Sequence, residues 1–396
     1  MRHTKLFRAQ TTHHGVQNFI SGDLLTLVFH SSTFFAMDYS EAVCLRSFIC
    51  GDVGGTHARL QLWSETEERT PQLLLDRRYA SRDFDSLTAL VARFVSDTLP
   101  CLDAATPIDA TVIAICGPVE NERSSAGPVL PEQGPTGWGA DAAQLEIDLP
   151  RCRRCRLIND FVAVGYGIPA LEEEDVMELH SAAGADGEAE GGRGLIAAVG
   201  AGTGLGAVFL TWHNGDGESF YCAHPSEGGM SAFTARTDEE WQLREWLRQR
   251  DGGAEPTVES VVSGPGLSAA FEFVRRSCTS AAPFSEPAAI AAHALATPPD
   301  KTARRALDLW LGALGGHLRA TALHLLPRGG LYITGGIAPQ LAAHLRTVLP
   351  DLYVQKHSVM GAFVATFPLR LVLNADVGLL GARIRAERLL REAPGL

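Results

Sequence analysis

Three times in this chain of 396 residues, an apolar run leads directly into a cluster of glycines, at 51–56, 200–206 and 334–336. Glycine has no Cβ, so backbone N–H groups in such turns approach a ligand closely and form nests for anions. A single glycine turn means little, but three after apolar strands constrain the fold strongly. They favour an α/β protein that holds a nucleotide between two sheets.

A dinucleotide-binding fold is the main alternative to this interpretation. Residues 202–207 match the pattern G-x-G-x-x-A, which in that fold follows a strand and opens a helix. Here Ala207–Leu210 and, after the first turn, Ala58–Trp63 have the pattern of a second strand. Strand, turn and strand form a hairpin that can wrap phosphates. This arrangement is not the strand–turn–helix of the dinucleotide-binding fold. A P-loop is excluded because the chain contains no Gly-Lys dipeptide.

Between the turns, segments with the apolar pattern of strands alternate with segments that have the apolar spacing of helices. The length of the chain allows two domains. Apolar runs predict strands at 58–63, 111–116, 156–158, 195–199, 207–210 and 331–333. Helical spacing predicts helices at 84–99, 161–168, 241–250, 305–326 and 378–390. Strands followed by helices, with repeated glycine turns, indicate an α/β protein with two related halves.

Charge and cysteine content limit the partners and the compartment. The net charge is −12, from 46 acids against 34 bases, which argues against nucleic acid or an anionic membrane as the main partner. No run of 18 apolar residues occurs, so no membrane span is predicted. The eight cysteines are scattered, which favours reduced thiols in a cytosol-like compartment.

Residues 1–47 differ from the rest of the chain and are predicted to be an N-terminal extension. Up to Met37 they carry Arg2, Lys5 and Arg8 against one acid, Asp23. We expect this extension to be a disordered tail or a targeting segment. The predicted location is the cytoplasm, with an organelle as the alternative if residues 1–46 act as a transit segment.

Asp52 is the only acid in the first glycine turn. A carboxylate beside a phosphate cradle is a natural Mg²⁺ ligand, often through water. The alternative is an aspartate that accepts hydrogen bonds from its own turn. Thr56 and Thr203 can likewise donate hydroxyls to phosphate or bond within their turns.

An acid and amide cluster provides the groups that a sugar site requires. Asn159 and Asp160 follow a strand and open a helix, which alone is typical of a helix cap. Glu227 and Glu259 lie near two further glycine turns. Sugar hydroxyls need acceptors, and one carboxylate must take a proton from the attacking hydroxyl. Together with the phosphate turns, these four residues favour a sugar kinase site.

Taken together, the motifs resemble those of the bacterial-type, ATP-dependent glucokinases of group A. The matching blocks, in family order, are GDVGGTHARL at 51–60, INDF at 158–161, GAGTGLG at 200–206, SEGG at 226–229, SGPGL at 263–267, ITGGIAP at 333–339 and GLLG at 378–381. The resemblance covers roughly residues 48–390.

This resemblance implies an actin-like, ribonuclease H-like ATPase fold with two lobes flanking a cleft. The small lobe would comprise residues 48–165 plus about 375–396, and the large lobe about 166–374. The implied reaction transfers the γ-phosphoryl group of ATP to the 6-hydroxyl of glucose with Mg²⁺ as cofactor. Lobe closure on the sugar would exclude water.

Site residues are carried over position by position. Asp160 matches the catalytic base, and Asn159, Asp160, Glu227 and Glu259 match the sugar ligands. The nucleotide-binding positions implied by the match are Gly51, Asp52, Gly54, Gly55, Thr56, Gly202, Thr203, Gly204, Gly335 and Gly336, with Asp52 as the Mg²⁺ ligand through water. The implied partners are glucose and ATP, and a homodimer stays open.

Two departures leave the hexose open. The family usually has a sugar-contacting His three residues after the Glu of the Glu-Gly-Gly turn, and here Met230 stands there. The Pro-rich segment 127–138, where the family has a sugar-facing loop, also diverges. A kinase for mannose or fructose therefore remains an alternative. A catalytically silent sugar sensor is a second alternative, which the presence of Asp52 and Asp160 disfavours.

Overall fold

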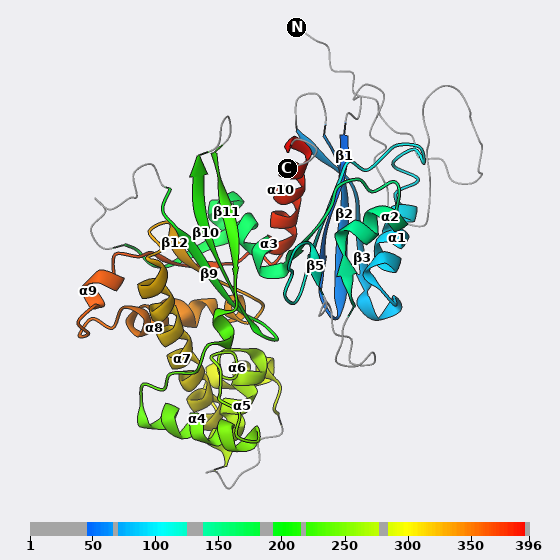
Figure 1. Ribbon diagram of the computed structural model, residues 1–396. Helices are drawn as coiled ribbons and strands as arrows, with labels where there is room; N and C mark the ends of the chain where they lie inside the picture. Colours follow the sequence, from blue (N-terminus) through cyan, green and yellow to red (C-terminus); the bar gives the residue numbers. More distant parts are fainter. Residues whose placement is uncertain are drawn as a thin grey trace, which may run out of the picture.

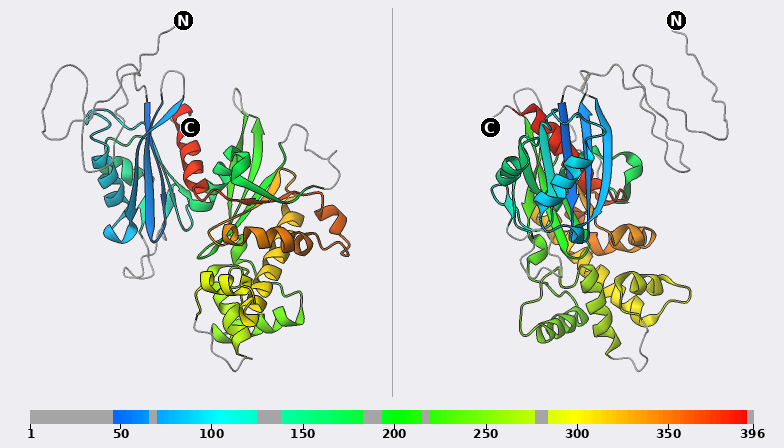
Figure 2. Two further views of the ribbon diagram at one scale, coloured as in Figure 1. Left: turned by 180° about the vertical axis from the view of Figure 1, so that it is seen from behind. Right: turned by 90° about the vertical axis from the view of Figure 1, so that its right-hand side faces the viewer.

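The computed structural model describes residues 46–65, 70–124, 138–182, 193–214, 219–276 and 284–392. Two sheets with their own helices lie next to each other, as the opposite views of Figures 1 and 2 show. The predicted extension 1–47 lies outside the described residues except for its last two positions. Segment 127–138 also lies outside them except for Trp138.

The first sheet has five strands in the order β3-β2-β1-β4-β7. Their bounds are β1 Arg46–Val53, β2 His57–Glu65, β3 Pro71–Ala80, β4 Ala110–Ile115 and β7 Cys155–Asn159. Strands β1 to β3 are antiparallel, whereas β1, β4 and β7 are parallel. A short pair, β5 (Arg123–Ser124) and β6 (Ala140–Asp141), lies apart from this sheet.

Helices cover both faces of the first sheet. Ile49 of β1 packs into a core with α1 (Leu87–Asp97) and α2 (Ala142–Asp148). The neighbouring Phe48 points the other way, into a core with α10 (Val377–Arg391). This burial on both faces explains why β1 and β4 are continuous apolar runs without alternation.

Helix α1 is shorter than the sequence predicts. It begins at Leu87, because the Ser86 hydroxyl caps it by accepting a hydrogen bond from the N–H of Ala89 at 3.1 Å. Phe84, which fits the helical spacing, lies before the cap and packs edge-on against Tyr79 with ring centroids 5.6 Å apart. The predicted start at residue 84 is therefore wrong by three residues.

The second sheet has six strands in the order β11-β10-β9-β12-β13-β8. Their bounds are β8 Val176–His180, β9 Ile196–Ala201, β10 Leu205–Asn214, β11 Ser219–Ser226, β12 Gly330–Thr334 and β13 Leu369–Val372. Strands β9 to β11 are antiparallel, and β9, β12 and β13 are parallel. The pairing of the first sheet is thus repeated here, with β8 added at the edge.

Five longer helices accompany the second sheet on one side. They are α4 Asp238–Arg250, α5 Gly264–Arg275, α6 Pro287–Leu295, α7 Lys301–Leu325 and α8 Ala342–Val354, with the short α9 at Gly361–Val364. Ala197 and Val199 of β9 pack into one large core with α5, α7 and α8. Helices α4, α5 and α6 gather beyond one end of the sheet (Figure 1).

Helix α3 (Asp160–Gly167) lies where the two sheets meet. It packs against α10, which covers β1 and β4, and against the hairpin of β10 and β11. Its residue Phe161 lies against β9 and β10 at two glycines. A Cβ atom at either Gly200 or Gly206 would overlap the Phe161 ring. These glycines are therefore required by a close approach of ring to backbone.

None of the helices in the described ranges is long and apolar enough to cross a membrane. The six cysteines within those ranges are free thiols, and Cys152 and Cys155 are buried in the core of the first sheet. This burial agrees with a structural role for the two thiols.

The contact of Phe161 with the hairpin can be tested by adding one methyl group. Gly206→Ala is expected to lower the free energy of unfolding by about 2 kcal/mol, because the ring and the strand are forced apart. Urea unfolding followed by far-UV circular dichroism measures this loss.

Gly202→Ala is the matched control, because a Cβ there meets no atom within 4 Å. Its expected change is within about 0.5 kcal/mol. Equal midpoints for the two variants would show that the ring does not pack as described.

Candidate active site

Asn159 lies at the end of β7 and caps α3. Its Oδ1 accepts hydrogen bonds from the N–H groups of Phe161 at 2.9 Å and Val162 at 3.2 Å. Its Nδ2 donates to the carbonyl of Gly117 at 3.0 Å and to Oδ1 of Asp160 at 2.9 Å. These four bonds use the whole capacity of the amide. In this structure Asn159 therefore positions Asp160.

Asp160 is the first residue of α3, and only one of its oxygens is anchored. Oδ1 accepts hydrogen bonds from Asn159 and from the N–H of Phe161 at 2.9 Å. No hydrogen bond within the described residues involves Oδ2. Burial raises the pKa of this carboxyl to about 6, although the Phe161 N–H opposes the shift and the charge of Asp52 adds to it.

A cavity of about 330 Å³ opens beside Asp160. Its wall includes the acids and amide that the sequence singled out, together with most of the second glycine turn. These predicted residues are Asn159, Asp160, Glu227, Glu259, Gly202, Thr203, Gly204 and Gly335. The fold therefore brings together residues from β7, the β9–β10 turn, the end of β11 and the segment before α5.

Glu259 ties two turns of this cavity together. Its Oε2 accepts a hydrogen bond from the N–H of Leu205 at 2.8 Å, within the second glycine turn. Its own N–H donates to the carbonyl of Gly229 at 2.9 Å, in the short 3₁₀ helix that follows Glu227. The carboxylate therefore lies against Gly204, where a Cβ would come within 2.6 Å of it.

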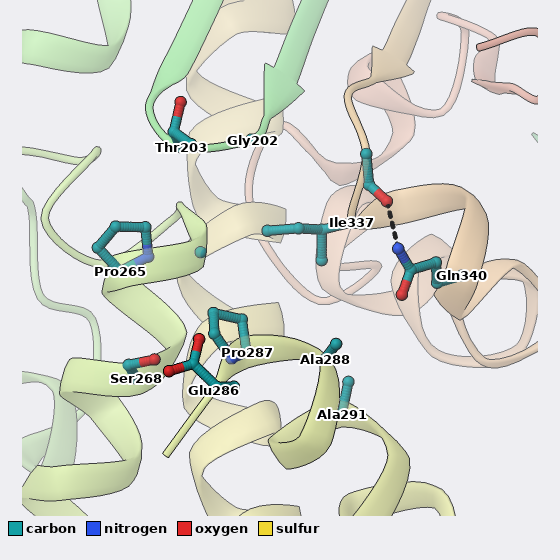
Figure 3. A pocket seen from close by; sticks show the side chains of 12 residues that line it. Gly202, Thr203, Pro265, Ser268, Glu286, Pro287, Ala288, Ala291, Ile337 and Gln340 are labelled. Atoms are coloured by element: carbon teal, nitrogen blue, oxygen red, sulfur yellow. Dashed lines mark hydrogen bonds between the residues drawn. The ribbon is translucent and has the colours of Figure 1, made fainter. Parts of the chain in front are cut away.

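A second, larger cavity of about 560 Å³ lies on the other side of the same turn. Figure 3 shows Pro265 of α5 and Pro287 of α6 along one side and Ile337 with Gln340 on the other. Gln340 Nε2 donates to the carbonyl of Gly336 at 2.9 Å. The wall of this larger cavity is formed by Gly202, Thr203, Gly264, Pro265, Ser268, Glu286, Pro287, Ala288, Ala291, Gly336, Ile337 and Gln340.

Gly202 and Thr203 belong to the walls of both cavities. A ligand in the larger cavity can therefore cross the backbone of this turn and reach Asp160. The larger cavity offers apolar side chains with a few polar groups, as pockets for flat aromatic ligands do. Backbone N–H groups of a glycine turn suit phosphates.

The first glycine turn is placed differently. Gly51, Asp52, Gly54, Gly55 and Thr56 are absent from the walls of both cavities. Its ends are fixed, since the N–H of Gly54 donates to His57 at 3.0 Å and the Ser81 hydroxyl donates to Gly54 at 2.7 Å. Of this turn, the carboxylate of Asp52 is close enough to Asp160 to raise its pKa.

Asp52 is a carboxylate in an unfavourable environment. Burial raises its pKa, and the neighbouring charge of Asp376, just before α10, adds to the shift. Asp52 is thus flanked by the carboxylates of Asp160 and Asp376, of which Asp376 is paired with Arg59 at 2.6 Å. A hard divalent cation such as Mg²⁺ fits this donor set, because it takes oxygen ligands and would relieve the repulsion.

Several wall residues were missed by sequence reasoning. Cys116, Gly117 and Pro118 line the smaller cavity, and α6 supplies much of the larger one. Segment 278–299 is rich in Ala and Pro and carries no periodic signal, but Pro287 at the first turn of α6 was a usable helix-start signal.

Of the two departures, only Met230 and Trp138 fall in the described residues. Met230 is 55% exposed and is absent from either wall. Trp138 is buried in the core of the first sheet. Residues 127–137 are outside the described ranges.

Two sheets with the same strand pairing and two cavities that share a turn define the class by its fold: the actin-like ATPase fold that two-lobed sugar kinases have. The glucokinase from Balamuthia mandrillaris, solved with glucose, has a TM-score of 0.70 at 18% identity, covering 88% of this chain and 94% of that one. A ROK family glucokinase from Streptomyces griseus, solved with glucose and AMPPNP, has a TM-score of 0.52 at 15% identity, covering 86% and 99%. These similarities establish the fold.

Sequence comparison establishes the family. The glucokinase from Synechocystis is 33% identical over an alignment of 366 residues that covers 86% of this chain and 98% of that protein. The profile of the family described as Glucokinase matches residues 49–389. The chain therefore belongs to the glucokinase family, and the identification from sequence motifs is confirmed.

The raised pKa of Asp160 predicts a pH-dependent stability difference. Its pKa is about 6 in the folded protein against 3.8 for an ordinary aspartate, so ionisation costs stability as the pH rises through this interval. Asp160→Asn removes that cost. Relative to wild type, the variant should gain on the order of 2 kcal/mol between pH 4 and pH 7.5.

Urea unfolding of both proteins at the two pH values measures the change. The comparison at pH 4 serves as the control for the substitution itself. A stability difference that is the same at both pH values would contradict the burial of this carboxylate.

Proposed function

We propose that this chain transfers the γ-phosphoryl group of ATP to the 6-hydroxyl of glucose, with Asp160 as the general base. The observation that carries the proposal is the turn at 202–204, which separates an apolar cavity from an acid-lined one and contributes to both walls. Membership of the glucokinase family supports the reaction. The solved relative that holds both glucose and AMPPNP supports the two substrates.

Asp160 is suited to proton transfer. Oδ1 is held by Asn159 and the start of α3, so Oδ2 is the oxygen that accepts the proton of the sugar hydroxyl. The freed oxygen attacks the γ-phosphorus, and ADP leaves with the former bridging oxygen. A base with a pKa of about 6 is ionised at neutral pH and is stronger than an ordinary aspartate.

Glu227 and Glu259 are the proposed acceptors for the other sugar hydroxyls. Both line the smaller cavity, and Glu259 accepts the hydrogen bond from the N–H of Leu205 with Oε2. A carboxylate accepts several hydrogen bonds, so Oε1 is available to a ligand. Asn159 can contribute only by exchanging one of its present partners.

The proposed adenosine site is the larger cavity, where Gly336 forms part of the wall. Gly202, Thr203 and Gly204 would hold phosphates by their backbone N–H groups, and Gly335 would lie beside them in the smaller cavity. Asp52 is the proposed Mg²⁺ ligand, through water. When bound, Mg²⁺ neutralises phosphate charge, which is a main requirement of phosphoryl transfer.

The proposed lobes are residues 48–165 with about 375–396, and about 166–374. The separate cores of the two sheets and the packing of α10 on β1 support these bounds. Gly51, Gly54, Gly55 and Thr56 would reach the phosphates when the lobes close, since none of them lines a cavity here. A homodimer and a cytoplasmic location, or an organelle one through residues 1–46, stay predictions.

The reaction is tested by ADP release with Mg-ATP across glucose, mannose and fructose. We expect turnover on glucose, and Asp160→Asn is expected to lower kcat by at least about 100-fold because the base is removed. The sugar affinity of this variant, measured by intrinsic fluorescence, should change little, because an amide keeps the Oδ1 contacts.

Each result separates the alternatives. Turnover mainly on mannose or fructose would overturn the choice of sugar. Glucose binding without turnover in the wild-type protein would favour a sensor. A variant that keeps most of its rate would show that Asp160 is not the base.

The adenosine site is tested by filling the larger cavity. Ala288 lies in its wall on the exposed side of α6, so Ala288→Phe places a ring in the cavity without disturbing the core. The KM for ATP is expected to rise by about tenfold or more, equivalent to about 1.4 kcal/mol, while the KM for glucose stays within about twofold.

Ala292→Phe is the matched control, because Ala292 is exposed on the same helix and is not part of the wall. It should leave both KM values unchanged. Equal effects of the two variants on the KM for ATP would place the nucleotide elsewhere.

A further inference from the structure

A second group of side chains, all of types that bind metal ions, lies on the hairpin of β10 and β11, outside both cavities. Within the described residues, the ligand atoms of His213, Cys222 and His224 lie within 4.8 Å of one another. None of the three belongs to the glycine turn at 200–206, to the acid cluster or to the wall of either cavity. The kinase reaction gives them no role.

The strand register explains why the three side chains meet. Thr211 lies opposite Cys222, Phe209 opposite His224, and Phe220 opposite His213. Side chains two residues apart point to the same face of a strand, so all six share one face of the hairpin. His213 and His224 lie on different strands at opposite ends of this face, and the Thr211–Cys222 pair lies between them.

Two imidazoles converge on one hydroxyl. Nε2 of His213 and Nε2 of His224 each lie 2.8 Å from Oγ1 of Thr211. A hydroxyl has one hydrogen and can donate to only one of them. Two ring nitrogens are therefore aimed at nearly the same point, next to a thiol.

Neighbouring rings hold the imidazoles in place. His224 stacks on Phe209 with centroids 5.0 Å apart, and His213 stacks on Phe220 at 5.9 Å. His213 is exposed, whereas Cys222 and His224 are partly buried. The group is thus accessible to an ion from solvent, and two of its ligands are already ordered by packing.

We propose that His213, Cys222 and His224 form a binding site for Zn²⁺. Two imidazoles and one thiolate are ligands that this ion prefers, at about 2.0–2.1 Å for nitrogen and about 2.3 Å for sulfur. Ligand atoms in such a tetrahedron lie roughly 3.3–3.8 Å apart, so the cluster must contract by about 1 Å. Rotation of the exposed His213 side chain can supply this contraction.

Binding is balanced by loss of one proton. The Cys222 thiol releases its proton to solvent as the sulfur–zinc bond forms, and the histidines bind as neutral rings. Water or the Thr211 hydroxyl completes the fourth position. The site therefore has the composition of an open, three-ligand centre.

The proposed zinc site lies on the hairpin whose strands lead to two turns of the smaller cavity. β10 begins at Leu205, next to the phosphate turn, and β11 ends at Ser226, next to Glu227. Ala207 pairs with Ser226 at the base of the ladder. A metal ion bound across the two strands would brace the element that carries both of these active-site turns.

Cobalt substitution of the full-length chain tests the proposal. Co²⁺ takes the same ligands and gives a thiolate-to-metal charge-transfer band, so the wild-type protein is expected to show this band and lose it on addition of one equivalent of Zn²⁺. Cys222→Ser should abolish the band. His213→Ala and His224→Ala should each weaken Zn²⁺ binding by at least about tenfold in competition with a chromophoric chelator.

Cys101→Ser is the matched control, because Cys101 is an exposed thiol in the other sheet's part of the chain and should leave the band intact. Metal-free circular dichroism and urea midpoints show that each variant is folded. The proposal is overturned if the wild-type protein gives no band. It is also overturned if Cys222→Ser keeps the band, or if both histidine variants bind Zn²⁺ as tightly as wild type.

Discussion

The packing of the Phe161 ring against Gly200 and Gly206 is the contact on which the active site depends. Asp160 precedes this ring directly, at the first turn of α3. The ring therefore fixes the proposed base relative to the β9–β10 turn, which carries the proposed phosphate ligands. Since α3 also packs against α10, the same contact joins the two sheets. Gly200 and Gly206 thus have a packing role, beside the phosphate-binding role proposed for the residues between them.

Charge in the site is arranged at a cost to stability. Burial raises the pKa of Asp52 and of Asp160, and a neighbouring carboxylate adds to each shift. The protein offsets part of this charge, since Arg59 pairs with Asp376 at 2.6 Å and Asn159 donates to Asp160. The remaining cost to folding suits the proposed site, which would receive a cation and a proton. Glu259 shows the opposite solution, because a backbone N–H at 2.8 Å already satisfies one of its oxygens.

Local sequence patterns predicted β2, β4, β7, β9, β10 and β12, the two hairpins and the acids that line one cavity, but not β3, β8, β11 or β13. Apolar runs and glycine turns have short-range causes, so they can be read from one segment. The apolar wall from α6 could not be predicted, because it forms only when segments distant in the chain meet. The role of Asn159 was also hidden, since its amide is engaged by Gly117, more than 40 residues earlier. Helix α1 was extended too far because Phe84 matched the spacing by chance.

Helix α10 has a consequence for how the chain is made. Its residues Leu379 and Ala382 cover Phe48 and Cys50 of β1, although they are synthesised after the strands of both sheets. While the ribosome is still translating, the first sheet lacks the cover of one apolar face. The second sheet has no such dependence on α10 for its large core. The first sheet to be translated is therefore the last to be completed, and its uncovered face is a candidate for chaperone binding on the nascent chain.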